Sequence, residues 1–154
     1  MDGGGDRLMS TVFLGPNEKL IREGYAHYHS GYSRVGHYMF GKLVLTNKRF
    51  MFQWQQPVAH GGFLGFGKKQ EMQTKGTPIN IPIDKITNVI TETRTRKKNT
   101  LSEPATLFSK EQFQIMIVSM DTPMGAENPT FEVENIQDWQ AAIQRAVGGE
   151  SVQF

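Results

Sequence analysis

The residues of this sequence best suited to binding chemistry are basic, and the densest group lies at positions 94–98. It holds four cations in five residues: Arg94, Arg96, Lys97 and Lys98. On an extended chain Arg94, Arg96 and Lys98 share one side, which suits contacts to phosphate or carboxylate groups. No aromatic side chain is interleaved with them, so a base-stacking nucleic-acid surface is not expected. The run therefore predicts an anion-binding site, and the alternative is a solvated run of charges.

A second basic pair follows three apolar side chains in the glycine-rich segment 62–69. The apolar side chains are Phe63, Leu64 and Phe66, and the pair is Lys68 and Lys69. The segment has the G-x-x-x-x-G-K spacing of a phosphate-binding P-loop, but Lys69 stands where that motif requires Ser or Thr, and no strand–loop–helix context surrounds it. We expect instead a loop tip whose apolar side chains contact a membrane interface while the lysines meet lipid headgroups. The alternative is that the two phenylalanines fold back onto the domain.

Residues that could support catalysis or bind a metal form no recognised motif. His27 and His29 could share a strand face, but no third ligand stands at a recognisable spacing and H-E-x-x-H is absent. The sequence contains no cysteine, no G-x-S-x-G nucleophile elbow and no carboxylate pair singled out by its spacing. We therefore expect no metal site, no cofactor and no enzymatic activity.

Charge is distributed unevenly along the chain, although the formal net charge is only +2. Residues 34–98 carry twelve basic and three acidic side chains, whereas residues 99–154 carry two basic and eight acidic ones. Unless folding interleaves these segments, the surface should have a basic pole and an acidic pole. A basic pole would suit anionic lipid, phosphate or an acidic protein surface. The alternative is that the basic segment pairs internally with the acidic third.

The elements that must position these residues are predicted to be β-strands of one domain. A chain of 154 residues can bury a core without disulfides. The clearest signal is a hairpin, because segments 38–46 and 49–54 are rich in aromatic and β-branched residues and flank a two-residue turn that begins with Asn. Phe50, Phe52 and Trp54 should share the inner face of its second strand.

The remaining strand signals are weaker. Residues 55–78 show no periodicity and contain five glycines, which predicts a long functional or mobile loop. Residues 94–103 are predicted as a loop or a strand extension, and Pro82 indicates an edge strand or a bulge. Phe113, Ile115 and Ile117 should share one strand face. The other short strands are expected at residues 18–28, 79–83, 85–91, 105–108, 112–119 and 130–133.

The C-terminal segment changes to a helical period. Its apolar stripe consists of Ile136, Trp139, Ile143 and Val147. Asn135 is the expected N-cap, and glycines 148 and 149 should end the helix. We expect residues 1–14 to be a disordered tail, residues 15–147 the folded domain and residues 148–154 a flexible tail. No apolar run approaches the roughly 18 residues of a spanning helix, and no signal-peptide pattern opens the chain, so we expect a cytoplasmic location.

Three segments carry a motif pattern: EKLI at 18–21, GKLVLTNKRFMF at 41–52 and IPIDKI at 81–86. They resemble the pleckstrin-homology (PH) superfamily, closest to its GRAM, bacterial PH and GLUE branches, over about residues 17–147. The resemblance implies a mainly β fold with one C-terminal helix: a seven-stranded antiparallel barrel or sandwich capped by the helix. It places the basic run 94–98 in a loop after the fifth strand, and the long loop after the central hairpin is most similar to the GLUE branch.

The resemblance implies a noncatalytic binding module, but it leaves the ligand open because this superfamily binds phosphoinositides, peptides and ubiquitin on one scaffold. The first hypothesis is peripheral docking to anionic phospholipid through the six basic residues at 68, 69, 94 and 96–98. The second is a GLUE-like ubiquitin-binding adaptor domain of an endosomal-sorting (ESCRT) complex subunit. In that case the outer face of the terminal helix would contact the partner through Gln137, Gln140, Gln144 and Arg145.

Overall fold

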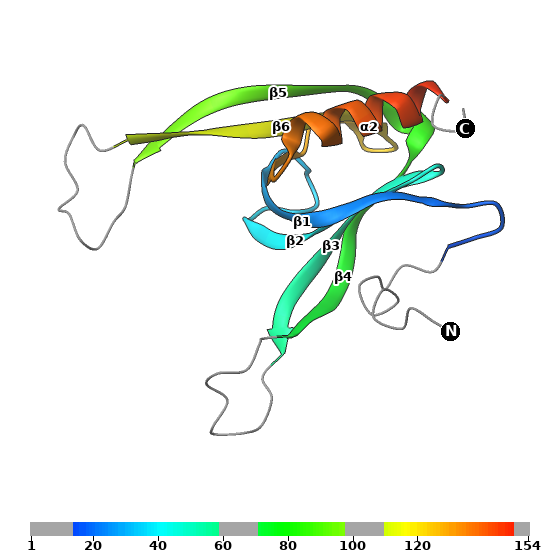
Figure 1. Cartoon of the computed structure of the whole chain (residues 1–154), viewed down its shortest axis with the longest axis horizontal. Coiled ribbons are helices and arrows are strands. Elements are labelled where there is room, and N and C mark those ends of the chain that lie inside the picture. The colour runs from blue at the N-terminus through cyan, green and yellow to red at the C-terminus, as the bar shows by residue number, and fades with distance from the viewer. Residues whose placement is uncertain (1–13, 59–70, 98–109, 150–154) are drawn as a thin grey trace.

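The computed structural model describes residues 14–58, 71–97 and 110–149. Eight strands and a short 3-10 helix precede one α-helix in the described part of the chain (Figure 1). In chain order the elements are β1 (Leu20–Ser30), β2 (Met39–Thr46), β3 (Arg49–Val58), β4 (Glu71–Pro82), η1 (Ile83–Lys85), β5 (Ile86–Lys97), β6 (Lys110–Thr122), β7 (Gly125–Glu127), β8 (Thr130–Val133) and α2 (Ile136–Gly148). The predicted fold class, mainly β with one C-terminal helix, is confirmed.

The strands form an antiparallel sheet with the order β4-β3-β2-β1-β8-β6-β5, and β7 pairs with β6 beside this path. Seven strands therefore lie on the main path, as the PH-like expectation requires. Strands β4 and β5 end that path, so the sheet is open rather than a closed barrel. Helix α2 packs across β5, β6 and β1, and its apolar side chains join the core between the two halves of the sheet (Figure 1).

The predicted central hairpin is confirmed as β2 and β3. Phe50 and Phe52 are fully buried in the core, whereas Trp54 is only partly buried. The register shifts on both sides of Trp54, where that residue lies opposite Gly76 of β4. Such bulges interrupt the two-residue alternation that marks a strand. This explains why the prediction of a loop is wrong for residues 55–58 and 71–78: β3 continues to Val58 and β4 already begins at Glu71. Residues 59–70 lie outside the described residues.

The basic run is also more regular than expected. Strand β5 extends through Lys97 and pairs with β6 from Ile86↔Met120 to Lys97↔Lys110, so a loop over residues 94–97 is wrong and the strand extension is confirmed. Strand β6 pairs with β5, β7 and β8, and the strand expected at 105–108 lies outside the described residues. Pro82 ends β4, a strand at the end of the sheet path, in agreement with the expected edge position.

Strand β6 buries a different face from the one its pattern suggested. Met116, Val118 and Met120 belong to the main core cluster, whereas Phe113 and Ile117 are partly exposed. Residues 115–118 are apolar at every position, so alternation could not decide between the two faces. Ile115 is buried as well, outside the main cluster.

Helix α2 begins and ends close to the predicted positions. Ile136, Trp139 and Ile143 are buried, but Val147 is 40% exposed, so the expected stripe stops one turn early. Asn135 precedes the helix with φ 56° and makes no side-chain capping bond, whereas Gly149 caps the end in the left-handed conformation. The predicted tails at 1–14 and 148–154 lie almost wholly outside the described residues. None of the helices in the described ranges is long and apolar enough to cross a membrane.

Candidate functional site

The structure describes only part of the predicted lipid-binding set. Phe63, Leu64, Phe66, Lys68 and Lys69 lie outside the described residues, as does Lys98. Arg94, Arg96 and Lys97 lie on β5, which forms with β6 one of two hairpins that extend away from the body (Figure 1). The other is β3–β4, whose far ends flank the segment with the two lysines.

Arg94 has one ionic partner among the described residues. Its Nε donates to Glu92 Oε1 at 3.2 Å, and both side chains are about half exposed, at 45% and 48%. An ion pair between two residues on the same strand, this open to water, is weak. Arg94 can therefore turn to an anionic ligand at little cost.

Arg96 has hydrogen-bond partners at all three guanidinium nitrogens and an aromatic ring beside its guanidinium. Its Nε donates to Glu111 at 2.6 Å, its two terminal nitrogens donate to the two carboxylate oxygens of Glu132 at 3.1 Å each, and its guanidinium lies 4.2 Å from the ring centre of Phe113. A bidentate pair of this kind fixes an arginine in one geometry. We call Arg96, Glu111, Glu132, Phe113 and His29 the Arg96 cluster, and in it Arg96 holds β5, β6 and β8 together.

His29 belongs to the Arg96 cluster, and His27 lies next to it. His29 stacks on Phe113 and bonds Glu132 at 3.1 Å, while His27 shares a hydrogen bond with the Tyr38 hydroxyl. Burial lowers the pKa of His27, which favours the neutral ring. Burial alone would raise the pKa of Glu132, but the bonds from Arg96 and His29 outweigh it and lower that pKa. No group of three potential metal ligands occurs within residues 14–58, 71–97 and 110–149.

The outer face of α2 divides into two parts. Gln137, Gln144 and Arg145 are exposed, as the ubiquitin hypothesis requires. Gln140 instead donates from Nε2 to the backbone oxygen of Val89 at 3.1 Å, which anchors the helix to β5. Beside this anchor a small groove of about 130 Å³ runs between β5 and the end of the helix, with Gln144 and Val147 on its helical side.

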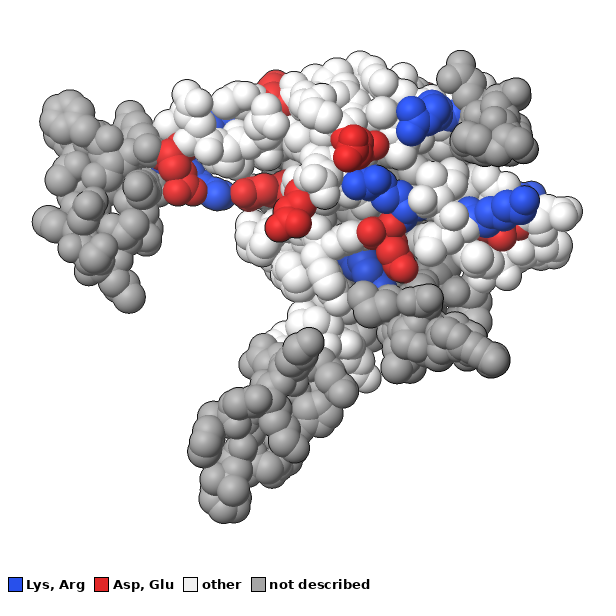
Figure 2. Space-filling view, in the orientation of Figure 1, with Lys and Arg blue, Asp and Glu red and all other residues white. Residues whose placement is uncertain are grey.

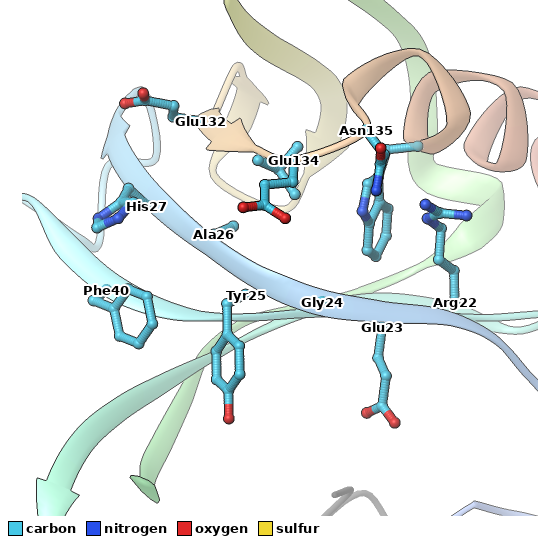
Figure 3. A pocket seen from close by; sticks show the side chains of 12 residues that line it. Arg22, Glu23, Gly24, Tyr25, Ala26, His27, Phe40, Glu132, Glu134 and Asn135 are labelled. Atoms are coloured by element: carbon cyan, nitrogen blue, oxygen red, sulfur yellow. The ribbon is translucent and has the colours of Figure 1, made fainter. Parts of the chain in front are cut away.

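A larger cavity lies between β1 and the start of α2 (Figure 3). It has a volume of about 510 Å³, and we call it the β1–α2 groove. Its lining comes from β1, from Phe40 of β2, from the end of β8, from the connection between β8 and α2, and from Trp139 of α2. The residues are Arg22, Glu23, Gly24, Tyr25, Ala26, His27, Phe40, Glu132, Val133, Glu134, Asn135 and Trp139. Six of these residues are consecutive on β1, so the groove follows the edge of that strand.

Two polar atoms in this groove are buried without a hydrogen-bond partner in the described part of the chain: Arg22 Nε and Glu23 Oε1. The Arg22 guanidinium lies 5.4 Å from the ring centre of Trp139 and only 4.0 Å from Asp138. Lys42 Nζ approaches Glu23 Oε1 to 3.5 Å. Buried polar groups without partners are uncommon in folded proteins, so both atoms need an explanation.

Sequence reasoning missed this groove. The helical stripe identified Trp139 as a core residue, which it is, but gave no sign that its indole also walls a cavity. Gly24 in the first strand gave no signal either, because a Cβ there would lie 3.6 Å from the Trp139 ring, which is an ordinary van der Waals contact.

The predicted separation of charge is absent from the face shown in Figure 2, where basic and acidic side chains alternate. Ion pairs join residues that are distant in sequence: Glu18 with Arg49, Glu23 with Lys42, Asp138 with Arg22, and Glu132 with Arg96. Within the described residues, folding thus pairs part of the basic segment 34–98 with acidic side chains from both neighbouring segments.

Comparison with known proteins adds little to this geometry. No family profile matches the sequence, and neither does any curated protein. Similar solved structures include two crystal structures of the DH/PH domains of p115-RhoGEF, one of them a mutant, with TM-scores of 0.45 and sequence identities of 13% and 12%. The matches cover 85% of this chain and 31% of the other chains. Similarity this low assigns neither a family nor a ligand.

Proposed function

We propose that this chain is a noncatalytic, PH-like recruitment module that docks peripherally to membranes containing anionic phospholipid. The observation that carries the proposal is the pair of hairpins, β3–β4 and β5–β6, that extend beyond the body and bracket the basic segments of the sequence (Figure 1). Lysine and arginine near an anionic bilayer each contribute about 1 kcal/mol of attraction.

The proposed contacts differ from the sequence prediction in one residue. Arg94, Lys97 and Lys98 on the β5–β6 side act with Lys68 and Lys69 on the β3–β4 side, and Phe63, Leu64 and Phe66 enter the interface. Arg96 serves a different purpose here, because Glu111 and Glu132 occupy its guanidinium. Its role is to hold the hairpin in place.

Co-sedimentation with phosphatidylserine-containing vesicles, compared with pure phosphatidylcholine vesicles, tests the proposal. The double variant Lys68→Glu/Lys69→Glu should lower the partition coefficient by at least about 30-fold, at ~1 kcal/mol for each lost cation. The matched control is Lys48→Glu/Lys85→Glu, an equal change of charge at two exposed residues near the β2–β3 turn and η1. Equal losses for the two double variants would contradict the assignment of the hairpin ends.

Ubiquitin binding is the second candidate, supported by the surface between α2 and β5. Val147 is 40% exposed and lines the small groove beside exposed Gln144. Such a modest apolar patch with a polar rim resembles a transient protein interface. Titration of isotopically labelled ubiquitin with the chain should shift ubiquitin resonances, and Val147→Ser should weaken the effect while Leu20→Ser, at an equally exposed position on β1, should not. A spectrum that stays unchanged in excess chain excludes this function.

A further inference from the structure

We propose that the β1–α2 groove binds an extended peptide segment of a partner protein, which adds as a strand along residues 20–25 of β1 and sets a lysine or arginine side chain against Glu134. The inference goes beyond membrane docking and concerns a different part of the molecule from the hairpin ends.

The first support is an unused strand edge. Strand β1 pairs with β2 from Leu20 to Tyr28, but with β8 only from Ala26 to Ser30. Among the described residues, positions 20–25 therefore have a strand neighbour on one side alone. In an antiparallel sheet alternate residues direct their N–H and C=O groups to opposite sides, so this stretch presents main-chain donors and acceptors to the groove. An exposed edge of this kind is the template used when peptides add to a sheet.

The second support is the shape and chemistry of the walls. The indole of Trp139 stands beside Gly24, and Phe40 and Tyr25 stack with ring centres 5.4 Å apart. Tyr25 is 44% exposed, so its ring offers apolar surface to a ligand. These rings would flank alternate side chains of an added strand.

The third support is a donor that lacks an acceptor. Arg22 Nε is buried and has no hydrogen-bond partner among the described residues. The Arg22 side chain is 32% exposed, so a small rotation of its guanidinium brings Nε toward the groove, where a carbonyl oxygen of an added strand would accept from it. An unpaired buried donor is unfavourable, and a bound main chain would supply the missing acceptor.

The charged side chains that line the groove determine which charge the peptide should carry. Three glutamates line the groove: Glu23, Glu132 and Glu134. Glu23 pairs with Lys42 at 3.5 Å, and Glu132 is occupied by Arg96 and His29. Glu134 is exposed and has no ion pair or hydrogen bond in the described part of the chain, and in Figure 3 its carboxylate extends toward β1. This unpartnered carboxylate repels a phosphate or an acidic segment and attracts a basic one.

The test uses the full chain and two matched nine-residue peptides that alternate threonine and valine around a central residue, lysine in one and glutamate in the other. Both are acetylated and amidated, and binding is followed by backbone amide NMR at millimolar peptide concentrations. We expect the lysine peptide to shift the amides of residues 20–25 and to bind about two- to fivefold more tightly than the glutamate peptide, the range for one exposed ion pair. Glu134→Lys should reverse that preference, whereas Asp121→Lys, the same change at an exposed residue of β6, should not.

Three results would overturn the proposal: amide shifts confined to the other sheet ends at β4 or β5, equal affinities for the two peptides, or no shifts with either peptide. The amide spectrum of each variant confirms its fold before the comparison. Vesicle binding by Glu134→Lys is measured in parallel and should not fall below the wild-type value, which separates this site from membrane docking.

Discussion

Arg22 and Arg96 both lie on the sheet with the guanidinium over an aromatic ring, but their bonding partners differ. Arg96 has hydrogen-bond partners at Nε and at both terminal nitrogens, supplied by Glu111 and Glu132. Arg22 lies over Trp139, but its only ion pair is with Asp138 at 4.0 Å and its Nε is unpaired within the described residues. The difference teaches that bonding partners, rather than charge or exposure, distinguish a structural arginine in the Arg96 cluster from a ligand-facing one in the β1–α2 groove.

The largest expected effect comes from the wall of the groove. Trp139→Ala removes a side chain that is 2% exposed and should lower the free energy of unfolding by about 3–5 kcal/mol. Val147→Ala, on the exposed side of the same helix, should change it by less than about 0.5 kcal/mol. Urea unfolding measures both values. Similar losses for the two variants would show that Trp139 does not link the groove to the core.

A third arginine, Arg49, forms an ion pair with Glu18. Burial alone would raise the pKa of Glu18, but hydrogen bonds from Arg49, the Gly15 amide and Thr46 outweigh it and lower the pKa to about 2. Because the folded-state pKa lies below the ordinary value of 4.5, this stabilisation is complete above pH 4.5 and is lost as the pH falls toward 2. It amounts to ~3 kcal/mol at 1.36 kcal/mol for each pKa unit.

The matching experiment compares urea unfolding at pH 7 and pH 3. Glu18→Gln should be less stable than the wild type at pH 7 and should lose less stability on acidification. Glu134→Gln is the control, because Glu134 has no partner in the described part of the chain, and it should follow the wild type. An acid response of Glu18→Gln equal to that of the wild type would rule out this source of pH dependence.

The direct comparison replaces each ring-stacked arginine by methionine. Arg96→Met should lower the melting temperature more than Arg22→Met does, because it breaks a bidentate pair and leaves Glu132 with His29 alone. It should also raise the pKa of Glu132, since the bonds from Arg96 help to hold that pKa down. Calorimetry and carboxyl-carbon NMR titration measure the two effects. Equal melting temperatures, with an unchanged Glu132 titration, would break the distinction between the two regions.

The smallest expected effect concerns Arg94. Arg94→Gln should leave the melting temperature unchanged, because its partner Glu92 is about half exposed. Binding to phosphatidylserine vesicles should fall about fivefold, the equivalent of roughly 1 kcal/mol for one cation. A drop in melting temperature as large as that of Arg96→Met would place Arg94 with the structural arginines.

The fold was more predictable than the site. The aromatic hairpin around Phe50 and Phe52 and the helix anchored by Trp139 both follow from local periodicity, and both are confirmed. The bulges around Trp54 hid the continuation of β3 and β4, because they shift the alternation on which strand prediction depends. The fully apolar run 115–118 hid the core face of β6.

The β1–α2 groove could not be predicted because it is a product of pairing. Arg22 and Trp139 are far apart in sequence. No local pattern indicates that β8 pairs with the second half of β1 and leaves the first half of that strand without it. The different roles of Arg94 and Arg96 were hidden for the same reason. They share one strand and one residue type, and only the positions of Glu111 and Glu132 separate them.

The most direct test of the distinction between the two arginines is an NMR spectrum of their Nε–H groups during titration with the lysine peptide. Arg22→Lys and Arg96→Lys variants assign the two signals. We predict that the Arg22 signal moves as its free donor gains an acceptor, while the Arg96 signal, already bonded to Glu111, stays in place. Movement of the Arg96 signal with a stationary Arg22 signal would contradict the account.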